Sequence, residues 1–272
     1  MSFTPVLPAT GLVGWVFLDR TYENQRATFD KSPLITRDTA YFEENIGKVK
    51  TAEDLVSDRR LLRVALGAFG LQDDINNTFF IQKILEGGTL KEDSLANKMT
   101  DQRYKDLARK FGFDLTPPST AISTFGSEIV EKYRQQQFEV AVGEQDDTMR
   151  LALNADRALA ALSSDTSSVN AKWFKIMGTS ALRQVFQTAF GLPSSISQMD
   201  LDKQLELFKD RAESVLGSED PSVLADDEQR EGFIRKFLLR SQLDEYQAST
   251  SGSIAQTLLS SAVSFAYSLR TP

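Results

Sequence analysis

Apolar residues recur along most of the chain at intervals of three and four, the spacing that places side chains on one face of an α-helix. The clearest of these stripes starts near Asp200 and consists of Leu201, Leu205, Phe208, Ala212 and Val215. Similar stripes occur within 122–133, 151–162 and 254–269. No stretch alternates apolar and polar residues between hairpin turns. The pattern predicts an all-α fold, a multi-helix bundle of roughly ten helices with no significant β-sheet.

Capping residues and prolines indicate where the helices begin. Residues 51–54 (TAED) have the spacing of a capping box, and Asp101 is suited to the N-cap of a later helix. Pro117 and Pro118 break the helical pattern. No proline occurs within 119–162, so this region forms one long helix or two helices joined near 143–147.

The composition is that of a globular chain, with 41% apolar and 25% charged residues. Residues 1–10 contain two prolines and no helical period, and we expect a flexible lead-in there. The remaining residues, 11–272, are predicted to form a single all-α domain. The serine-rich stretch 163–168 is the best candidate for an internal joint, which would divide that domain into helical subdomains 11–162 and 169–272.

The tetrapeptide Ala-Phe-Gly-Leu occurs twice, at 68–71 and at 189–192, each time after an apolar helical run. Glycine directly after such a run is typical of a left-handed residue just past a helix end, and the apolar residue that follows packs back onto the last turn. A phosphate-binding loop would instead need several glycines before a helix start. We therefore interpret three such sites as helix stops, formed by Gly70, Leu71, Gly112, Phe113, Gly191 and Leu192.

The two tetrapeptides also have similar flanks. Leu61 and Val64 before the first copy correspond to Leu182 and Val185 before the second. Two explanations stay open, an internal repeat of a helix pair and a stop signal that is used more than once.

The chain contains neither cysteine nor histidine. This excludes disulfides, thiolate zinc sites, and catalysis by Ser-His-Asp or Cys-His groups. The formal net charge of −7 opposes binding to a phosphate backbone, so we expect no nucleic-acid partner. We predict a protein that is not an enzyme and that uses neither a cofactor nor a metal ion.

Four pairs of adjacent acidic residues could each contribute to a carboxylate site for glycan cleavage or for a hard cation. They lie at 73–74, 146–147, 219–220 and 226–227. Each pair stands beside an expected helix start or loop, which favours a capping role. Two alternatives to a structural protein remain: a carboxylate-dependent hydrolase that acts on cell-wall glycans, and a helical module that binds a small molecule.

Two further polar groups are candidates for binding. Asp58 and Arg59 begin a charged cluster before an apolar helix, where an internal salt-bridged cap is favoured over a grip on an anion. Glu139 and Arg150 lie in an otherwise apolar helical region. We predict that they form a buried ion pair, with a binding role as the alternative.

The last predicted helix has a continuous apolar face, opposite a face rich in serine. The apolar face consists of Ile254, Leu258, Ala262, Phe265 and Leu269. This helix packs on its own domain or docks on another subunit. It is too short and too rich in hydroxyl groups to span a bilayer, and the apolar stretch 12–18 lacks the basic flank of a secretory signal. We expect synthesis in the cytoplasm, and export without a signal peptide would leave no such mark.

Four segments of the chain, taken in order, indicate a resemblance to a known family. They are AYFEENIGKVKTAEDLVSDRRLLRVALGAFGL, RQQQFEVAVGEQDDTMRLAL, WFKIMGTSALRQVFQTAFGLP and MDLDKQL. Together, from about Tyr41 to Arg211, they resemble an uncharacterised family of alphaproteobacterial proteins that are often encoded within flagellar gene clusters. The resemblance implies a flagellar setting without an assigned activity. We therefore expect a structural or protein-interaction component of the flagellar system, either exported or acting in assembly, with protein partners.

Overall fold

A computed structural model describes residues 3–268 of the chain. Within that range it contains thirteen α-helices, six short 3₁₀ helices and no strand, which confirms the all-α fold. The α-helices are α1 (Gly11–Asp30), α2 (Pro33–Asn45), α3 (Ala52–Ser57), α4 (Arg59–Gly67), α5 (Thr78–Gly87), α6 (Leu95–Lys98), α7 (Gln102–Phe111), α8 (Phe125–Gly143), α9 (Asp147–Ala160), α10 (Val169–Gly178), α11 (Ser180–Phe190), α12 (Leu201–Leu216) and α13 (Asp227–Ser268). The 3₁₀ helices are η1 (Ile46–Lys48), η2 (Gln72–Asn76), η3 (Ser119–Ala121), η4 (Ala161–Ser164), η5 (Ser194–Gln198) and η6 (Pro221–Ala225).

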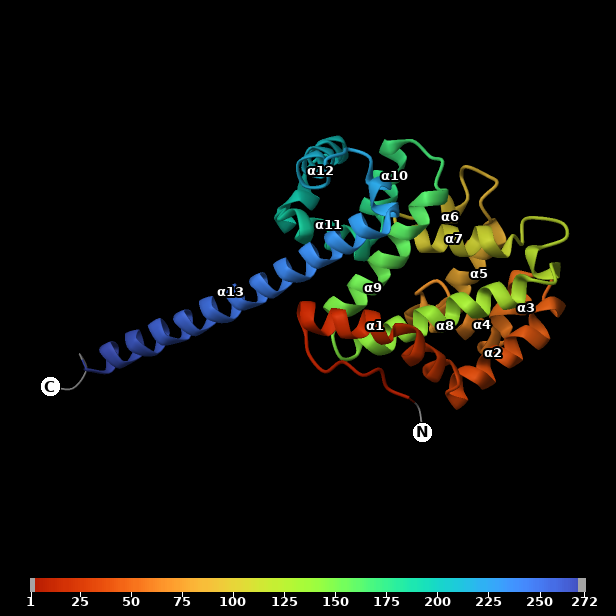
Figure 1. Ribbon diagram of the computed structural model, residues 1–272. Coiled ribbons are helices and arrows are strands. Elements are labelled where there is room, and N and C mark those ends of the chain that lie inside the picture. The colour runs from red at the N-terminus through yellow and green to blue at the C-terminus, as the bar shows by residue number, and fades with distance from the viewer. Residues whose placement is uncertain (1–2, 269–272) are drawn as a thin grey trace.

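Helices α8 and α9 pack against each other at the centre of the molecule. On one side, α8 contacts α2 and α4, and on the other side, α9 contacts α11 and α13 (Figure 1). One continuous hydrophobic cluster includes Leu62, Phe138 and Trp173, and so draws residues from both sides of the serine-rich stretch 163–168. The central helix pair therefore gives the two halves of the chain a shared core.

The helix starts agree with the capping residues. Thr51 and Asp54 form both hydrogen bonds of a capping box at α3, and Asp101 caps α7. The region 119–162 forms two helices, because α8 ends at Gly143 and Asp146 caps α9 by accepting a hydrogen bond from the Met149 N–H. The stripe expected from Ile122 starts too early, since η3 precedes it and α8 begins only at Phe125.

Two of the expected helix stops lie where the sequence places them. Gly112 ends α7 with a φ of 58°, and Gly191 ends α11 with a φ of 65°. The Leu192 N–H donates to the Gln187 carbonyl, five residues earlier, at 2.8 Å, and this is the 6→1 hydrogen bond of a Schellman motif. Leu192 is buried, and the Phe113 ring packs against the core.

The third stop differs in its position along the chain. Gly70 has the left-handed φ of 68°, but α4 ends at Gly67, so a short turn separates the helix from this glycine. The buried Leu71 still donates its N–H to the Leu66 carbonyl at 2.9 Å. After each Ala-Phe-Gly-Leu copy the chain enters a 3₁₀ helix, η2 or η5. The two copies thus share a stop followed by a tight turn.

Residues 3–10 form no helix and run along the body of the protein. The side-chain amide of the buried Gln25 accepts from the Val6 N–H at 2.6 Å and donates to the Val6 carbonyl at 3.2 Å. Gln145 donates to the Pro5 carbonyl at 2.7 Å. These bonds satisfy backbone groups that no helix pairs.

Helix α13 is a single helix of 42 residues, longer than the last helix expected from the sequence. Its first part is held in the core by Phe233, Ile234, Phe237 and Leu238, and the rest extends away from the body (Figure 1). The side chains of the expected apolar face lie outside the described side chains, and Leu269 lies outside the described residues. None of the helices within 3–268 combines the length and the apolar character that crossing a membrane requires.

Candidate functional site

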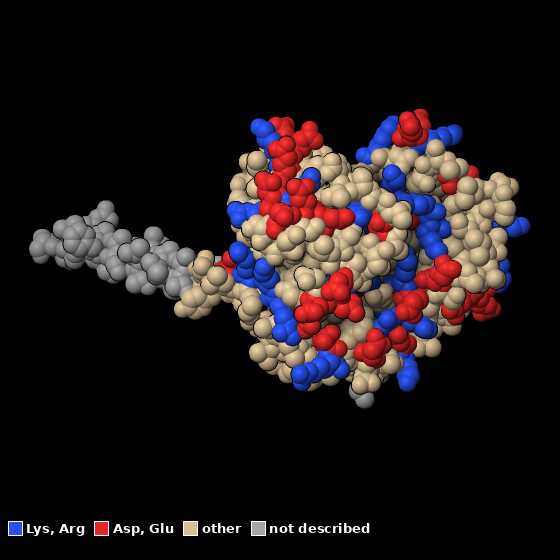
Figure 2. All heavy atoms as spheres, turned by 45° about the horizontal axis from the view of Figure 1, so that its top comes forward, with Lys and Arg blue, Asp and Glu red and all other residues tan. Residues whose placement is uncertain are grey.

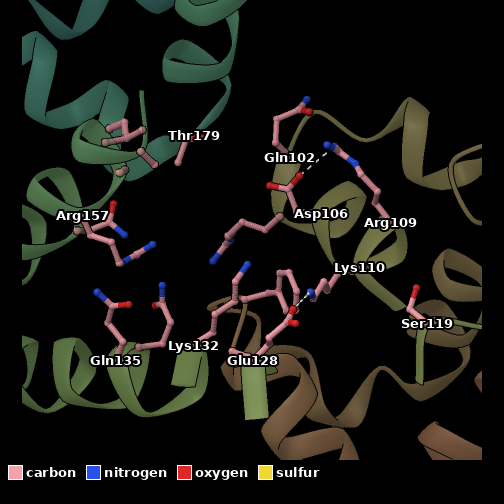
Figure 3. A pocket seen from close by; sticks show the side chains of 18 of the residues that line it. Gln102, Asp106, Arg109, Lys110, Ser119, Glu128, Lys132, Gln135, Arg157 and Thr179 are labelled. Atoms are coloured by element: carbon pink, nitrogen blue, oxygen red, sulfur yellow. Dashed lines mark hydrogen bonds and ion pairs between the residues drawn. The ribbon is translucent and has the colours of Figure 1, made fainter. Parts of the chain in front are cut away.

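A cleft with a volume of about 840 Å³ opens between α7, α8 and α9. The turn after α4 supplies Ala68 and Phe69 to one wall, and the start of α11 supplies Thr179 and Leu182 to another. Both Ala-Phe-Gly-Leu stops are therefore architectural, yet the elements that they end also shape this cleft. Figure 3 shows side chains from α7, α8 and α9 converging on it.

The cleft is basic although the whole chain is acidic. Five cationic side chains line it, and they are Arg103, Arg109, Lys110, Lys132 and Arg157. Only two carboxylates, Asp106 and Glu128, belong to the same lining. On the face drawn in Figure 2, basic side chains gather along a hollow in the surface. The excess of cations favours an anionic ligand.

Most of these cations already have a carboxylate partner. Arg109 pairs with Asp106 at 3.0 Å, and Lys110 pairs with Glu128 (Figure 3). Arg103 pairs with Asp101, outside the cleft, at 2.7 Å, and also donates to the Gly70 carbonyl. The lining acids are thus used in ion pairs.

Lys132 is the exception among the described residues that line the cleft, because its ammonium forms no ion pair there. It lies over the Phe69 ring, 5.1 Å from the centroid. The pKa of Lys132 is lowered, mainly because its ammonium is partly buried and to a lesser degree because Lys110 repels its charge. Part of the side chain is nevertheless exposed. A bound anion would relieve that repulsion.

The rest of the lining is neutral and mixed in character. Four amide side chains contribute donors and acceptors: Gln102, Gln135, Gln136 and Asn154. The apolar part comes mainly from Phe69, Ile122, Phe125 and Leu182. Such a lining suits a ligand with a charged end and an organic body.

The predicted ion pair between Glu139 and Arg150 is wrong. The buried Glu139 carboxylate accepts two hydrogen bonds from Arg157, at 2.8 and 3.2 Å. Arg150 instead packs against Gly143. Which arginine of α9 reaches Glu139 depends on how α8 and α9 pack against each other, and that packing brings Arg157 to the carboxylate.

The cluster at Asp58 is a structural cap. Asp58 accepts the N–H groups of Arg60 and Leu61 at the start of α4, and also the Tyr41 hydroxyl at 2.7 Å. Arg59 donates to Asn76 at 2.9 Å. The other two arginines of the cluster, Arg60 and Arg63, approach the buried carboxylate of Asp38.

The adjacent acids also serve mainly as caps. Asp146, Asp220 and Asp226 each accept a backbone N–H two or three residues ahead. Asp74 accepts from the Tyr104 hydroxyl at 2.7 Å. No group of three or more acidic side chains within the described part of the chain is placed to hold a metal ion.

A second candidate surface lies where α13 leaves the body. Leu239, Leu243 and Tyr246 are spaced by four and three, and their exposed fractions are 53%, 53% and 69%. On the two flanks of these side chains, Arg240 lies against Gly191 and Gln242 lies against Gly11, and the buried Phe237 and Leu238 face the body. The three exposed side chains therefore form an outward apolar stripe, which we call the α13 stripe.

Neither the cleft nor the α13 stripe was predicted from the sequence. None of the cationic side chains of the cleft was a candidate, since residues from five separate segments meet there only in the folded chain. The α13 stripe had a readable signal, the spacing of Leu239, Leu243 and Tyr246, which continues the pattern of the last predicted helix.

A family model described as a protein of unknown function (DUF1217) matches residues 68–229. The match includes every residue that lines the cleft, and it ends before the α13 stripe. An X-ray crystal structure of a protein from Agrobacterium tumefaciens is similar, with a TM-score of 0.72 and 26% sequence identity over 89% of this chain and 99% of that chain. Comparison with curated proteins gave no match.

Proposed function

This chain belongs to the DUF1217 family of proteins of unknown function, and from that starting point we propose that it is a non-enzymatic interaction component that a protein partner holds through α13. The observation that carries the proposal is the α13 stripe. Single exposed leucines are common on protein surfaces, but Leu239, Leu243 and Tyr246 lie in register on one helix face. Helices with such a face commonly dock into a groove of a partner.

The shape of α13 supports the same proposal. Its first part is anchored by buried side chains such as Phe237 and Leu238, so the projecting part is held by a rigid base. At about 1.5 Å per residue, the helix is roughly 60 Å long. A helix that leaves the body in this way presents its side chains to a partner (Figure 1).

The proposed setting is the flagellar system, in which the protein would be an exported component or an assembly factor. The support is the resemblance of the four quoted segments to a family often encoded among flagellar genes. Export without a signal peptide and an association with the flagellum belong to this proposal.

A catalytic role has less support from the cleft. Hydrolysis of a glycan by two carboxylates requires them to face each other across the substrate, about 5–10 Å apart, with at least one free to donate or accept a proton. Asp106 and Glu128 are each paired with a cation on the cleft wall. That arrangement favours binding over acid-base chemistry.

Deletion of the gene tests the proposal through swimming in soft agar and through detection of the protein in flagellar fractions. We expect reduced swimming, restored by the wild-type chain and not by a Leu239→Ser/Leu243→Ser double variant. Leu90→Ser is the matched control, because Leu90 is also exposed, at 69%, but lies in the turn that follows α5. Normal swimming of the deletion strain, with no protein in the flagellar fraction, would contradict the proposal.

A further inference from the structure

We propose that the cleft between α7, α8 and α9 binds a small phosphorylated organic molecule, with Lys132 and Arg157 as its main contacts to the phosphate. This binding site is separate from the α13 stripe and does not depend on it. Four features of the cleft support it: the charge of Lys132, the oriented N–H donors, the neutral lining residues and the volume.

The charge available to a ligand is concentrated at two side chains. Lys132 has no ion-pair partner among the described residues. Arg157 uses Nε and Nη2 for Glu139, and its Nη1 forms no hydrogen bond within the described part of the chain. Figure 3 shows Lys132 and Arg157 on the α8 and α9 sides of the same space, with Gln135 beside them. An anion placed there would meet one ammonium, one guanidinium and an amide.

The positions of these donors are fixed before a ligand arrives. The buried Glu139 carboxylate accepts two hydrogen bonds from Arg157, and these bonds orient the guanidinium. Arg103, which α7 contributes, is held by Asp101 and by the Gly70 carbonyl of the first Ala-Phe-Gly-Leu stop. Donors that are already oriented lose little entropy on binding, so they add to affinity.

The chemistry of the donors favours phosphate. A lysine ammonium acts as a point charge for a tetrahedral anion, and an arginine can add a directed N–H. Four of the five cations that line the cleft have a carboxylate partner, so the charge left for an anionic group is that of Lys132. The pKa of Lys132 is lowered first by partial burial of its ammonium and then by repulsion from Lys110 and Arg157, and a bound anion would offset that repulsion.

The remaining walls indicate an organic body. Phe69, Phe125 and Leu182 offer apolar contact, and the amides offer hydrogen bonds to neutral polar groups. A volume of about 840 Å³ falls within the range of small-molecule sites, roughly 300–1,000 Å³. A long polyanion is disfavoured, because the net charge of the whole chain is −7.

Isothermal titration calorimetry of the full chain at low salt tests this inference, with ATP, AMP, glucose 6-phosphate and pyrophosphate as probes. We expect at least one phosphorylated organic probe to bind with a submillimolar dissociation constant. Lys132→Ala should weaken that binding by about 10- to 100-fold, the effect of one charge-assisted hydrogen bond. Lys132→Arg should retain most of it.

Lys203→Ala is the matched control, because it removes the same charge from an exposed position on α12. Circular dichroism establishes that each variant is folded. The inference is overturned if no probe binds, if Lys132→Ala binds as tightly as the wild type, or if Lys203→Ala has the same effect as Lys132→Ala. It is also overturned if citrate or a poly-glutamate peptide binds at Lys132 and the phosphorylated probes do not.

Discussion

The pairing of Glu139 with Arg157 links the core to the cleft at the scale of single residues. The carboxylate is buried on α8, and the guanidinium comes from α9 and reaches the cleft surface. A buried carboxylate is costly unless it keeps a cation and hydrogen bonds, and Arg157 supplies both. Arg157 therefore has a structural role and contributes a donor to the cleft.

Arg157→Ala is expected to lower the free energy of unfolding by about 1–3 kcal/mol, since it leaves the Glu139 carboxylate buried without its partner. The estimate is below that for a fully buried pair, because the Arg157 side chain is about one third exposed. Arg150→Ala, the control on the same helix, should change it by less than about 1 kcal/mol. Urea denaturation measures both. Equal losses in the two variants would contradict the observed pairing.

Tyr104 makes a contribution to the free energy of unfolding that is lost at alkaline pH. Burial, together with the hydrogen bond to Asp74, raises the pKa of Tyr104 to about 12, above the value of about 10 that tyrosine has in an unfolded chain. A raised pKa stabilises the fold fully below the unfolded value, and that contribution is lost as the pH rises from about 10 to about 12.

In Tyr104→Phe, the free energy of unfolding should therefore fall less steeply between pH 10 and pH 12 than it does in the wild type. Urea denaturation at a series of pH values gives the two slopes, and tyrosinate absorbance reports the titration directly. Identical slopes, or a Tyr104 that ionises near its ordinary pKa, would show that the contact with Asp74 has no effect on titration.

Single-residue roles were only partly predictable from the sequence. Asp58 could be assigned to a cap because capping is a local interaction between a side chain and the next turn. The partner of Glu139 could not be assigned in the same way. It depends on the length of the turn after Gly143 and on the register of α8 against α9, neither of which is encoded by local spacing.

At the scale of elements, α13 combines an anchored part and a projecting part in one helix. Leu238 is fully buried and Leu239, its neighbour, is about half exposed, so the core side and the outward side of the helix are adjacent in sequence. The chain thus changes from core packing to a projecting surface without a loop. This continuity makes the helix base rigid.

Leu238→Ala should lower the free energy of unfolding by about 2–5 kcal/mol, because it removes a buried side chain and leaves a cavity. Leu239→Ala should change it by no more than about 0.5 kcal/mol, as an exposed substitution normally does. Thermal and urea denaturation of the two variants measure this difference. A large loss in Leu239→Ala would mean that the α13 stripe packs within the molecule.

Among the features of the helices, their ends were predicted best from the sequence, because capping side chains and left-handed glycines interact with residues only a few positions away. Asp101 and Gly112 lie at the two ends of α7, as the sequence indicates. The stop at Gly70 was placed directly at a helix end, but the chain turns once after Gly67 before it reaches that glycine. Gly67 lies close against Tyr133 of α8, so tertiary packing influences where α4 ends.

At the scale of the whole molecule, the all-α class followed from apolar spacing, whereas the cleft did not. Its lining comes from the turn after α4, from α7, α8 and α9, and from the start of α11, and no two of these segments show their contact in the sequence. Its charge is also opposite to the net charge of the chain, which averages over all surfaces. A local excess of cations becomes visible only once the helices are packed.

The central claim is that the α13 stripe holds a protein partner in the flagellar system. Photo-crosslinking in cells, with the reactive amino acid at position 243 and a control at position 90, tests it most directly, since both leucines are exposed. The account predicts a crosslink from position 243 to a flagellar protein and none from position 90. No crosslink from position 243, or the same products from both positions, would contradict it.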